Sequence, residues 1–361
     1  MSIPAPRLLF WETTKACNLR CRHCRAVPTE KPGPGELTAD EGRRLVDEAA
    51  DLGVRIFVFS GGEPLLRPDL FELIERARSR GMEAAVATNG TKLTAEVAAT
   101  FRRLGVARVS VSFDGPDAAT HDGFRGIPGA FDAARAGLAH LRGAGQPFQI
   151  NTTVTRENMD HLVEMVDMAE AEGAAALHFF FLVPVGCGAE IPPHQRITPD
   201  EYERLLGWFA DECDRRTLEM RATCAPHLQR IVAQRRGKAR AAAAPGHPGG
   251  HPGGAHVSRG CLAGSGIVFV GCDGTLQPCG YMPLVVGSIR DASLTAIWQG
   301  SQVLADLRDP GSLTGSCGRC AFRFRCGGCR ARALAASGDA LGDEPMCVWG
   351  AELDEPEPSG D

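Results

Sequence analysis

Long hydrophobic runs and an excess of positive charge are both missing from this sequence. No apolar stretch approaches the ~20 residues that a membrane-spanning helix requires, so we expect a soluble protein. The formal net charge is −5, with 39 Lys and Arg against 44 Asp and Glu. This balance argues against a protein that binds nucleic acid or an anionic membrane surface. No secretory signal is recognisable either, so we expect a cytoplasmic protein whose 14 cysteines bind metal rather than form disulfides.

Three of these cysteines form a compact group near the start of the chain. Cys17, Cys21 and Cys24 have the spacing C-x₃-C-x₂-C, which supplies three thiolates from one short loop. Soft thiolate ligands suit an iron–sulfur cube, and three of them leave its fourth iron open to bind another molecule. A structural zinc site would need four ligands, and disulfide pairing would leave one cysteine over. We therefore expect an iron–sulfur cluster with one reactive iron.

Residues 7–214 alternate between β-branched runs and amphipathic helical patterns. Thr38 and Thr198 each begin a capping box, and Thr94 and Asn158 are candidate N-caps. Six strand–helix units in strict alternation predict an α/β fold with a parallel sheet. Because a closed barrel has eight units, six predict a partial (β/α)6 TIM-like barrel with its site at the carboxyl ends of the strands. The predicted strands are residues 7–13, 54–59, 83–88, 106–113, 148–154 and 177–183.

The composition changes after residue 235, where the predicted barrel domain, residues 1–235, ends. Residues 236–256 combine Ala, Gly, Pro and His without apolar periodicity, which predicts a linker rather than a histidine metal site. Residues 257–350 are short, Gly-rich and cysteine-dense, as expected of a small module whose fold depends on bound metal. The acidic tail, residues 351–361, is predicted to be disordered.

Polar residues follow three of the predicted strands. Ser60-Gly61-Gly62-Glu63-Pro64 comes after the second strand, Asn89-Gly90 after the third, and Ser112-Phe113-Asp114 after the fourth. Two glycines allow a backbone to approach a ligand closely, and Glu63 brings a carboxylate to this edge of the sheet. Each segment alone could be a simple turn, since Asn-Gly and Asp-Gly are turn formers. Their recurrence at one edge, beside the cysteine loop, favours a binding site.

The cysteine loop, the Gly-Gly-Glu-Pro segment and the two polar loops together resemble the radical S-adenosylmethionine (SAM) superfamily. The resemblance implies that Cys17, Cys21 and Cys24 hold a catalytic [4Fe–4S] cluster whose open iron binds SAM. It implies one-electron cleavage of SAM to methionine and a 5′-deoxyadenosyl radical, which abstracts hydrogen from a substrate. Cofactor-binding residues implied in this way are Gly61, Gly62 and Glu63 for the amine, in the motif that Pro64 completes, and Asn89, Ser112, Asp114 and Arg125 for the ribose or carboxylate.

The second cysteine-rich region is similar to the SPASM type of auxiliary domain. The spacing runs Cys261-x₁₂-Gly-x₄-Cys279, then C-x₂-C-x₅-C-x₂-C from Cys317, then Cys347. A zinc ribbon would leave three of these seven cysteines unexplained. The resemblance implies two auxiliary [4Fe–4S] clusters. One set of ligands is Cys317, Cys320, Cys326 and Cys347; the other is Cys261, Cys279 and Cys329, with Cys272 as a candidate for the open fourth place.

The spacing of two residues between Cys326 and Cys329, where many peptide-modifying SPASM enzymes have three, looks like that of a narrower group that modifies tetrapyrroles. This group includes the heme synthases of the siroheme-dependent pathway, which convert two propionates of iron-coproporphyrin III to vinyls, giving heme b. The likeness implies a tetrapyrrole substrate and a ferredoxin- or flavodoxin-type electron donor. The run from Cys224 to His227 either approaches that substrate or packs locally.

Two other readings stay open at this stage. A peptide maturase of the SPASM type would form thioether or carbon–carbon crosslinks, or would activate a partner sulfatase. A simple iron–sulfur electron carrier would have no reaction of its own. The carrier needs no SAM pocket, so the Gly-Gly-Glu-Pro segment and the polar strand ends argue against it.

Overall fold

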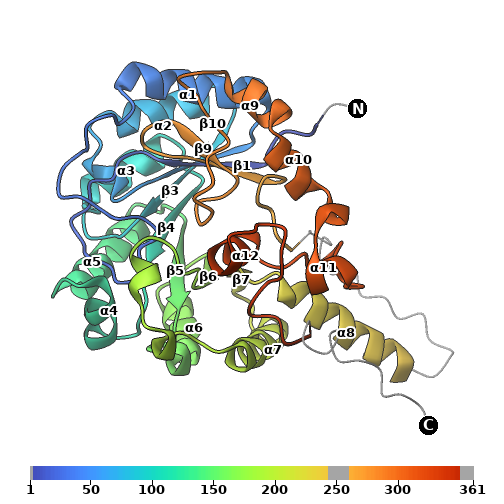
Figure 1. Ribbon diagram of the computed structural model, residues 1–361. Coiled ribbons are helices and arrows are strands. Elements are labelled where there is room, and N and C mark those ends of the chain that lie inside the picture. The colour runs from blue at the N-terminus through green and yellow to red at the C-terminus, as the bar shows by residue number, and fades with distance from the viewer. Residues whose placement is uncertain (1–2, 243–259, 350–361) are drawn as a thin grey trace, which may run out of the picture.

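The computed structural model describes residues 3–242 and 260–349, and these fold around one curved sheet (Figure 1). The strands lie in the order β10-β9-β8-β1-β2-β3-β4-β5-β6-β7, and all neighbours from β8 to β7 are parallel. Their bounds are β1 Leu8–Glu12, β2 Ile56–Ser60, β3 Glu83–Thr88, β4 Arg108–Ser112, β5 Phe148–Val154, β6 Ala176–Phe181, β7 Glu219–Thr223, β8 Ile267–Val270, β9 Thr275–Gln277 and β10 Gly287–Ser288.

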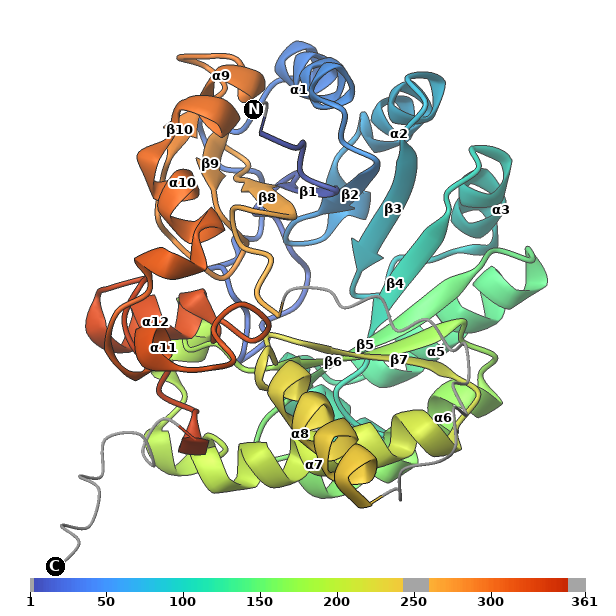
Figure 2. The same cartoon turned by 90° about the vertical axis from the view of Figure 1, so that its right-hand side faces the viewer.

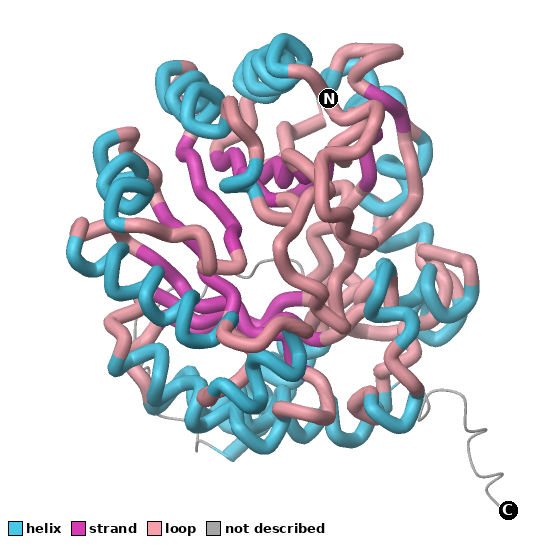
Figure 3. The backbone as a smooth tube through the Cα atoms, turned by 90° about the vertical axis from the view of Figure 1, so that its left-hand side faces the viewer, coloured by secondary structure: helices cyan, strands magenta, loops and turns pink. Residues whose placement is uncertain are grey.

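Helices cover the convex face of this sheet, and the strands curve around the inside, as the tube in Figure 3 shows. This is the arrangement of a partial TIM-like barrel, as predicted. The α-helices are α1 Ala39–Leu52, α2 Leu70–Ser79, α3 Ala95–Arg103, α4 Ala118–Arg125, α5 Ala130–Gly143, α6 Leu162–Ala171, α7 Pro199–Arg215, α8 His227–Ala242, α9 Leu294–Gly300, α10 Gln302–Arg308, α11 Gly315–Arg319 and α12 Arg330–Ser337; the short 3₁₀ turns are η1 Pro64–Leu66, η2 Met159–His161, η3 Gly186–Glu190, η4 Pro193–Gln195 and η5 Pro310–Ser312.

Local sequence signals explain where the main helices begin and end. The side chain of Thr38 accepts a hydrogen bond from Glu41 N and completes a capping box, and Gly53 ends α1 in the left-handed region with φ of 94°. A second complete box at Thr198 begins α7. Leu45 of α1 is fully buried and belongs to the large core between helices and sheet. These capping predictions are confirmed.

The N-cap prediction for Asn158 is wrong. Helix α6 begins at Leu162, and Asn158 precedes only the 3₁₀ turn η2, without a capping hydrogen bond. Its side chain instead accepts from Thr155 N at 2.9 Å and donates to the carbonyl of Asp114 at 2.9 Å. Because Asn158 is buried at the end of β5, these tertiary partners take its amide away from the helix.

The sheet is larger than the six predicted strands. A seventh parallel strand, β7, pairs with β6, and β8 pairs in parallel with β1, with Leu8 opposite Ile267. The C-terminal region thus continues the same sheet through the antiparallel strands β9 and β10. Figure 2 shows α11 and α12 of this region beside α8, across the open side of the curved sheet.

The predicted boundary at residue 235 falls inside a helix. Helix α8 continues to Ala242, so residues 236–242 are helical and do not belong to a linker. The rest of the predicted linker, with its three histidines, and the predicted disordered tail lie outside the described residues. In the parts of the chain that are described, no helix combines the length and apolar character required to cross a membrane.

Candidate active site

The cysteine loop leaves the carboxyl end of β1 and is held by backbone hydrogen bonds. Cys17 N donates to Thr29 O at 2.8 Å, and Arg20 N donates to Arg125 O at 3.1 Å. Cys17 and Cys21 are buried and Cys24 is partly exposed. All three predicted ligands therefore come from one loop that is tied both to itself and to the end of α4.

Two side chains from outside this loop, one just after β3 and one at the end of α4, donate to its sulfur atoms. Asn89 Nδ2 lies 3.8 Å from Cys17 Sγ, and Arg125 Nη1 lies 3.5 Å from Cys21 Sγ. Burial raises the pKa of Cys24 to about 11, so isolated thiolates are unfavourable here without a positive partner. The buried Nε of Arg125 has no hydrogen-bond partner among the described residues. Together with three soft thiol ligands and the donors to their sulfur atoms, this arrangement fits an iron–sulfur cluster.

The Gly-Gly segment after β2 packs directly against the backbone of the cysteine loop. Gly62 N donates to Thr14 O at 2.7 Å, and Glu63 N donates to Ala16 O at 2.7 Å. A Cβ atom at Gly62 would lie only 2.3 Å from Ala16 O, far inside any tolerable contact. The sequence needs glycine here because the two backbones touch, and this contact sets the height of the cysteine loop above β2.

Glu63 is fully buried, and its carboxylate is bound by the next strand. It accepts hydrogen bonds from Thr88 Oγ1 at 2.8 Å, Asn89 N at 2.9 Å and Leu65 N at 3.1 Å. Burial raises the pKa of Glu63. Pro64, also buried, begins the 3₁₀ turn η1. The carboxylate therefore joins the ends of β2 and β3, and its predicted contact with an amine stays a prediction.

Asp114 is completely buried and holds Arg125. Their side chains lie 2.6 Å apart, and Asp114 also accepts from Thr153 N at 2.7 Å. Although burial opposes ionisation, the Arg125 guanidinium keeps the pKa of Asp114 below its usual range. Asp114 thus holds Arg125 against Cys21, and the predicted ribose or carboxylate contacts of both residues stay predictions. Ser112, partly buried at the end of β4 in register with Asn151, stays a predicted ribose contact.

His23, inside the cysteine loop, belongs to the same buried group. Its ring stacks on Phe124 at 4.4 Å between centroids, and its Nε2 lies 3.7 Å from Asp114 Oδ2. Burial lowers the pKa of His23 to about 4, so the ring is neutral near pH 7. The stack holds the loop against α4.

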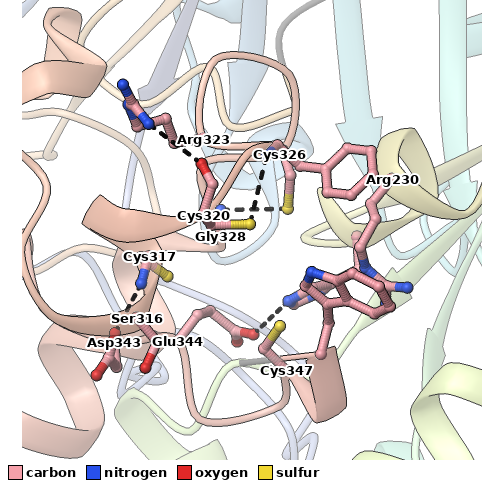
Figure 4. Close-up of a pocket in the computed structure, with 14 residues that line it drawn as sticks. Arg230, Ser316, Cys317, Cys320, Arg323, Cys326, Gly328, Asp343, Glu344 and Cys347 are labelled. Atoms are coloured by element: carbon pink, nitrogen blue, oxygen red, sulfur yellow. Dashed lines mark hydrogen bonds and ion pairs between the residues drawn. The ribbon is translucent and has the colours of Figure 1, made fainter. Parts of the chain in front are cut away.

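Four predicted ligands in the C-terminal region line one cavity of about 190 Å³. Figure 4 shows their side chains around it, with Phe322 N and Gly328 N donating to the sulfur atoms of Cys320 and Cys326 at 3.4 Å each. Among the described residues, no three His, Cys, Asp or Glu side chains gather as tightly as the ligands of one metal ion. Four thiols around one cavity fit an iron–sulfur cluster, which takes four thiolates. These residues are Cys317, Cys320, Cys326 and Cys347.

The other three predicted ligands also come together. Cys279 and Cys329 are buried, Cys261 is partly buried, and the three thiols interact electrostatically with one another. A fourth thiol, that of Cys224 in the loop between β7 and α8, packs against the same apolar cluster, and its contact with Cys329 lowers the pKa of Cys329. Sequence spacing missed this residue as a partner, because Cys224 stands 37 positions before Cys261.

The structure gives no support to Cys272 as the candidate fourth ligand. Cys272 lies in the turn between β8 and β9, where its backbone carbonyl accepts from Leu37 N at 2.7 Å. The charged groups that act on its thiol are Glu12, Glu36 and neighbours of that turn, and none of the three cysteines is among them. The sheet pairing of β8 with β1 carries Cys272 toward the start of α1, away from the other thiols.

A buried polar network joins the barrel to the C-terminal region. Arg332 of α12 donates to Glu344 and, at 3.0 Å, to Tyr202 Oη, and His227 Nε2 lies 2.9 Å from Glu344. His227 also hydrogen-bonds Cys347. Although burial favours the neutral ring, Glu344 raises the pKa of His227 to about 9. Helices α7, α8 and α12 therefore share one charged cluster beside the two groups of cysteines.

Comparison with known proteins agrees with this geometry. The Radical SAM superfamily model matches residues 11–169, and the model of the iron-sulfur cluster-binding SPASM domain matches residues 261–321. The chain is 45% identical over 345 residues to an AdoMet-dependent heme synthase of Methanosarcina barkeri, covering 96% of this chain and 97% of the relative. It is 32% identical to the mycofactocin maturase MftC of Mycolicibacterium smegmatis, covering 99% and 88%.

The fold is also that of solved structures. SuiB of Streptococcus suis bound to S-adenosylmethionine has a TM-score of 0.73 at 16% identity, covering 96% of this chain and 78% of that one. Both matched domains imply iron–sulfur clusters, one with SAM and the others auxiliary. The chain therefore belongs to the radical SAM superfamily, in a branch that carries a SPASM domain and includes the AdoMet-dependent heme synthases.

Proposed function

We propose that this protein is a radical SAM heme synthase that converts two propionates of iron-coproporphyrin III to vinyls, giving heme b. The observation that carries the proposal is the 45% identity to an AdoMet-dependent heme synthase along nearly the whole of both chains. The short C-x₂-C spacing from Cys326 to Cys329 supports the same group.

The bound [4Fe–4S] cluster supplies one electron, which cleaves SAM to methionine and a 5′-deoxyadenosyl radical. Cys17, Cys21 and Cys24 would hold that cluster. Arg125 and Asn89 donate to two of the sulfur atoms, and hydrogen bonds of this kind help to set the potential of a cluster. The buried walls of the site exclude water, which would otherwise quench a radical.

The substrate step needs an electron acceptor. Removing one hydrogen atom from the β-carbon of a propionate leaves a carbon radical; loss of CO₂ and of one further electron then forms the vinyl group. Two groups of thiols could take up this electron. One includes Cys329 of the C-terminal region and Cys224 of the β7–α8 loop, and the other lines the cavity that contains Cys317. A ferredoxin- or flavodoxin-type donor would reduce the SAM cluster before each cycle.

The test is anaerobic incubation of reconstituted protein with SAM, dithionite and iron-coproporphyrin III. We expect 5′-deoxyadenosine and porphyrin products that have lost CO₂ and hydrogen once and then twice, measured by mass spectrometry. Formation of 5′-deoxyadenosine without any change to the porphyrin would contradict the substrate assignment. No 5′-deoxyadenosine at all would leave only an electron carrier.

A peptide-modifying activity is the second candidate, because the mycofactocin maturase is 32% identical over almost the whole chain. The two candidate functions differ in whether the substrate absorbs visible light. A porphyrin changes its visible absorbance when it enters a protein site, whereas a peptide substrate does not absorb there. Titration of the protein with iron-coproporphyrin III therefore separates them before any turnover.

A further inference from the structure

We propose that Cys224 is the fourth protein ligand of the auxiliary cluster held by Cys261, Cys279 and Cys329, and that this cluster has no open iron. The inference rests on the proposed function only in that it assigns this cluster to electron transfer. The ligand itself comes from the barrel and not from the C-terminal region, so it lies outside the cysteine pattern of residues 261–347.

The position of Cys224 is the first support. Strand β7 ends at Thr223 and α8 begins at His227, so Cys224 lies in a tight connection at the carboxyl edge of the sheet. Among the described residues, it is the one non-glycine residue with a positive φ, 56°. Such a conformation costs free energy in a residue with a side chain and persists where the surroundings fix it.

The surroundings of Cys224 do fix it. The hydroxyl of Tyr202, itself fully buried in α7, donates to Cys224 O at 3.3 Å. That hydroxyl also accepts from Arg332 of α12. The backbone turn is therefore secured from two helices, and it directs the thiol toward Cys329.

The contacts of the thiol are the second support. Cys224 is partly buried and packs, with Cys261, against the apolar cluster that contains Cys279 and Cys329. Its thiol lies close enough to those of Cys329 and Cys279 to interact with both. Cys261 interacts with Cys329 in turn. The apolar wall around these thiols includes Val183, Val185, Met282, Leu307 and Ala331.

The chemistry of four thiols in an apolar pocket is the third support. A [4Fe–4S] cube takes four thiolates, one for each iron. Cys261, Cys279 and Cys329 alone would leave one iron open, as the loop from Cys17 to Cys24 does. With Cys224, every iron has a protein sulfur, so this cluster can pass an electron but cannot bind the substrate.

The test uses the full chain with Cys17, Cys21 and Cys24 all replaced by alanine, which leaves the auxiliary clusters as the iron in the sample. In this background we compare Cys224→Gly with Cys272→Ala. Glycine is chosen because it adopts a φ of 56° without strain, so that the change removes the thiol and spares the turn. Cys272→Ala removes a buried thiol that lies elsewhere.

The readouts are iron and sulfide per chain and the electron paramagnetic resonance (EPR) spectrum of the dithionite-reduced protein. For Cys224→Gly we expect a loss of about one to four irons per chain and the loss or replacement of one of two auxiliary signals. Cys272→Ala should keep both. Unchanged iron and an unchanged spectrum in Cys224→Gly would overturn the proposal, as would the same losses in Cys272→Ala.

Cys224→Ser covers the case in which the glycine variant does not fold. A serine oxygen can replace a thiolate on iron, so we expect nearly full iron content with an altered reduced spectrum in one signal. A spectrum identical to that of the parent would again overturn the proposal. Neither readout involves SAM cleavage or porphyrin, so these results are independent of the success or failure of the proposed reaction.

Discussion

The Arg125 guanidinium lies 2.6 Å from the carboxylate of Asp114, and its other amino group lies 3.5 Å from Cys21 Sγ. Asp114 is fully buried and Arg125 nearly so. Arg125, at the end of α4, is thereby joined to the segment after β4 through an ion pair and to the cysteine loop through a hydrogen bond. A buried charge pair of this kind is a poor source of net stability but is costly to break on one side.

Replacement of Asp114 by Asn should destabilise the protein strongly. It leaves the buried Arg125 guanidinium without its counterion, which typically costs about 3–5 kcal/mol. The melting temperature followed by circular dichroism measures this loss. The double change Asp114→Asn with Arg125→Gln should cost less than the sum of the single changes, because it removes both charges. Additive losses would contradict direct coupling.

The Gly62→Ala change tests the contact between the Gly-Gly segment and the cysteine loop. The new Cβ would lie 2.3 Å from Ala16 O, so the loop must move. We expect loss of most SAM cleavage and of about four irons per chain, because the three thiolates no longer converge. Gly33→Ala is the control, since its Cβ would meet no atom within 4 Å. Equal iron content in both variants would refute the argument.

Alanine at Cys17, Cys21 or Cys24 should abolish SAM cleavage while about eight irons per chain remain on the auxiliary clusters. The auxiliary clusters should keep their iron because the cysteine loop lies at the end of β1, whereas the other thiols lie in the C-terminal region and the β7–α8 loop. This prediction is checked by measuring both the 5′-deoxyadenosine formed and the iron bound per chain. SAM cleavage that survives in any of the three variants would disprove the ligand assignment.

Alanine at Cys317 or Cys347 should spare SAM cleavage and block the porphyrin product. Both residues line the cavity of the second auxiliary group, away from the cysteine loop. If that cluster accepts the last electron, hydrogen abstraction can begin but the vinyl group cannot form. The measurement is the amount of vinyl product, determined by mass spectrometry, compared with the amount of 5′-deoxyadenosine formed in the same reaction. Normal vinyl formation would remove this cluster from the electron path.

The contact between Glu41 and Arg290 should make stability depend on acid pH. Arg290 Nε lies 2.7 Å from Glu41 Oε1, and this hydrogen bond lowers the pKa of Glu41 from 4.5 to about 2. A lowered pKa means that the stabilisation is present above about pH 4.5 and is lost as pH falls toward 2. Glu41→Gln should therefore cost about 0.5–1 kcal/mol at pH 7.

That difference should shrink on acidification. Between pH 4.5 and pH 2 the unfolded parent binds a proton at Glu41 before the folded parent does, so the melting temperatures of parent and Glu41→Gln should converge over that range. Gln still completes the capping box of α1, so helix formation itself is preserved. A gap in melting temperature that stays constant from pH 7 down to about pH 2.5 would contradict a charge-based contribution.

Local signals in the sequence predicted most of the barrel. The bounds of β3 and β5 match the predicted residues 83–88 and 148–154, because each strand is a short β-branched or apolar run ended by turn residues. Strand β7 was missed because Glu219 and Arg221 interrupt its apolar pattern. Those side chains are tolerated because they pair with one another and with Arg108 of β4. Long-range pairs of this kind leave no trace in local periodicity.

The sequence by itself determined the chemistry of this protein: three thiols in one short loop, a Gly-Gly-Glu-Pro turn and seven further cysteines at fixed spacings, all of which follow from covalent order. Only the tertiary structure decided which thiols meet. The pairing of β8 with β1 carries Cys272 away from the other ligands, and the end of β7 brings Cys224 to Cys329. Spacing along a chain fixes neighbours within a loop, whereas contacts between loops depend on how the sheet closes.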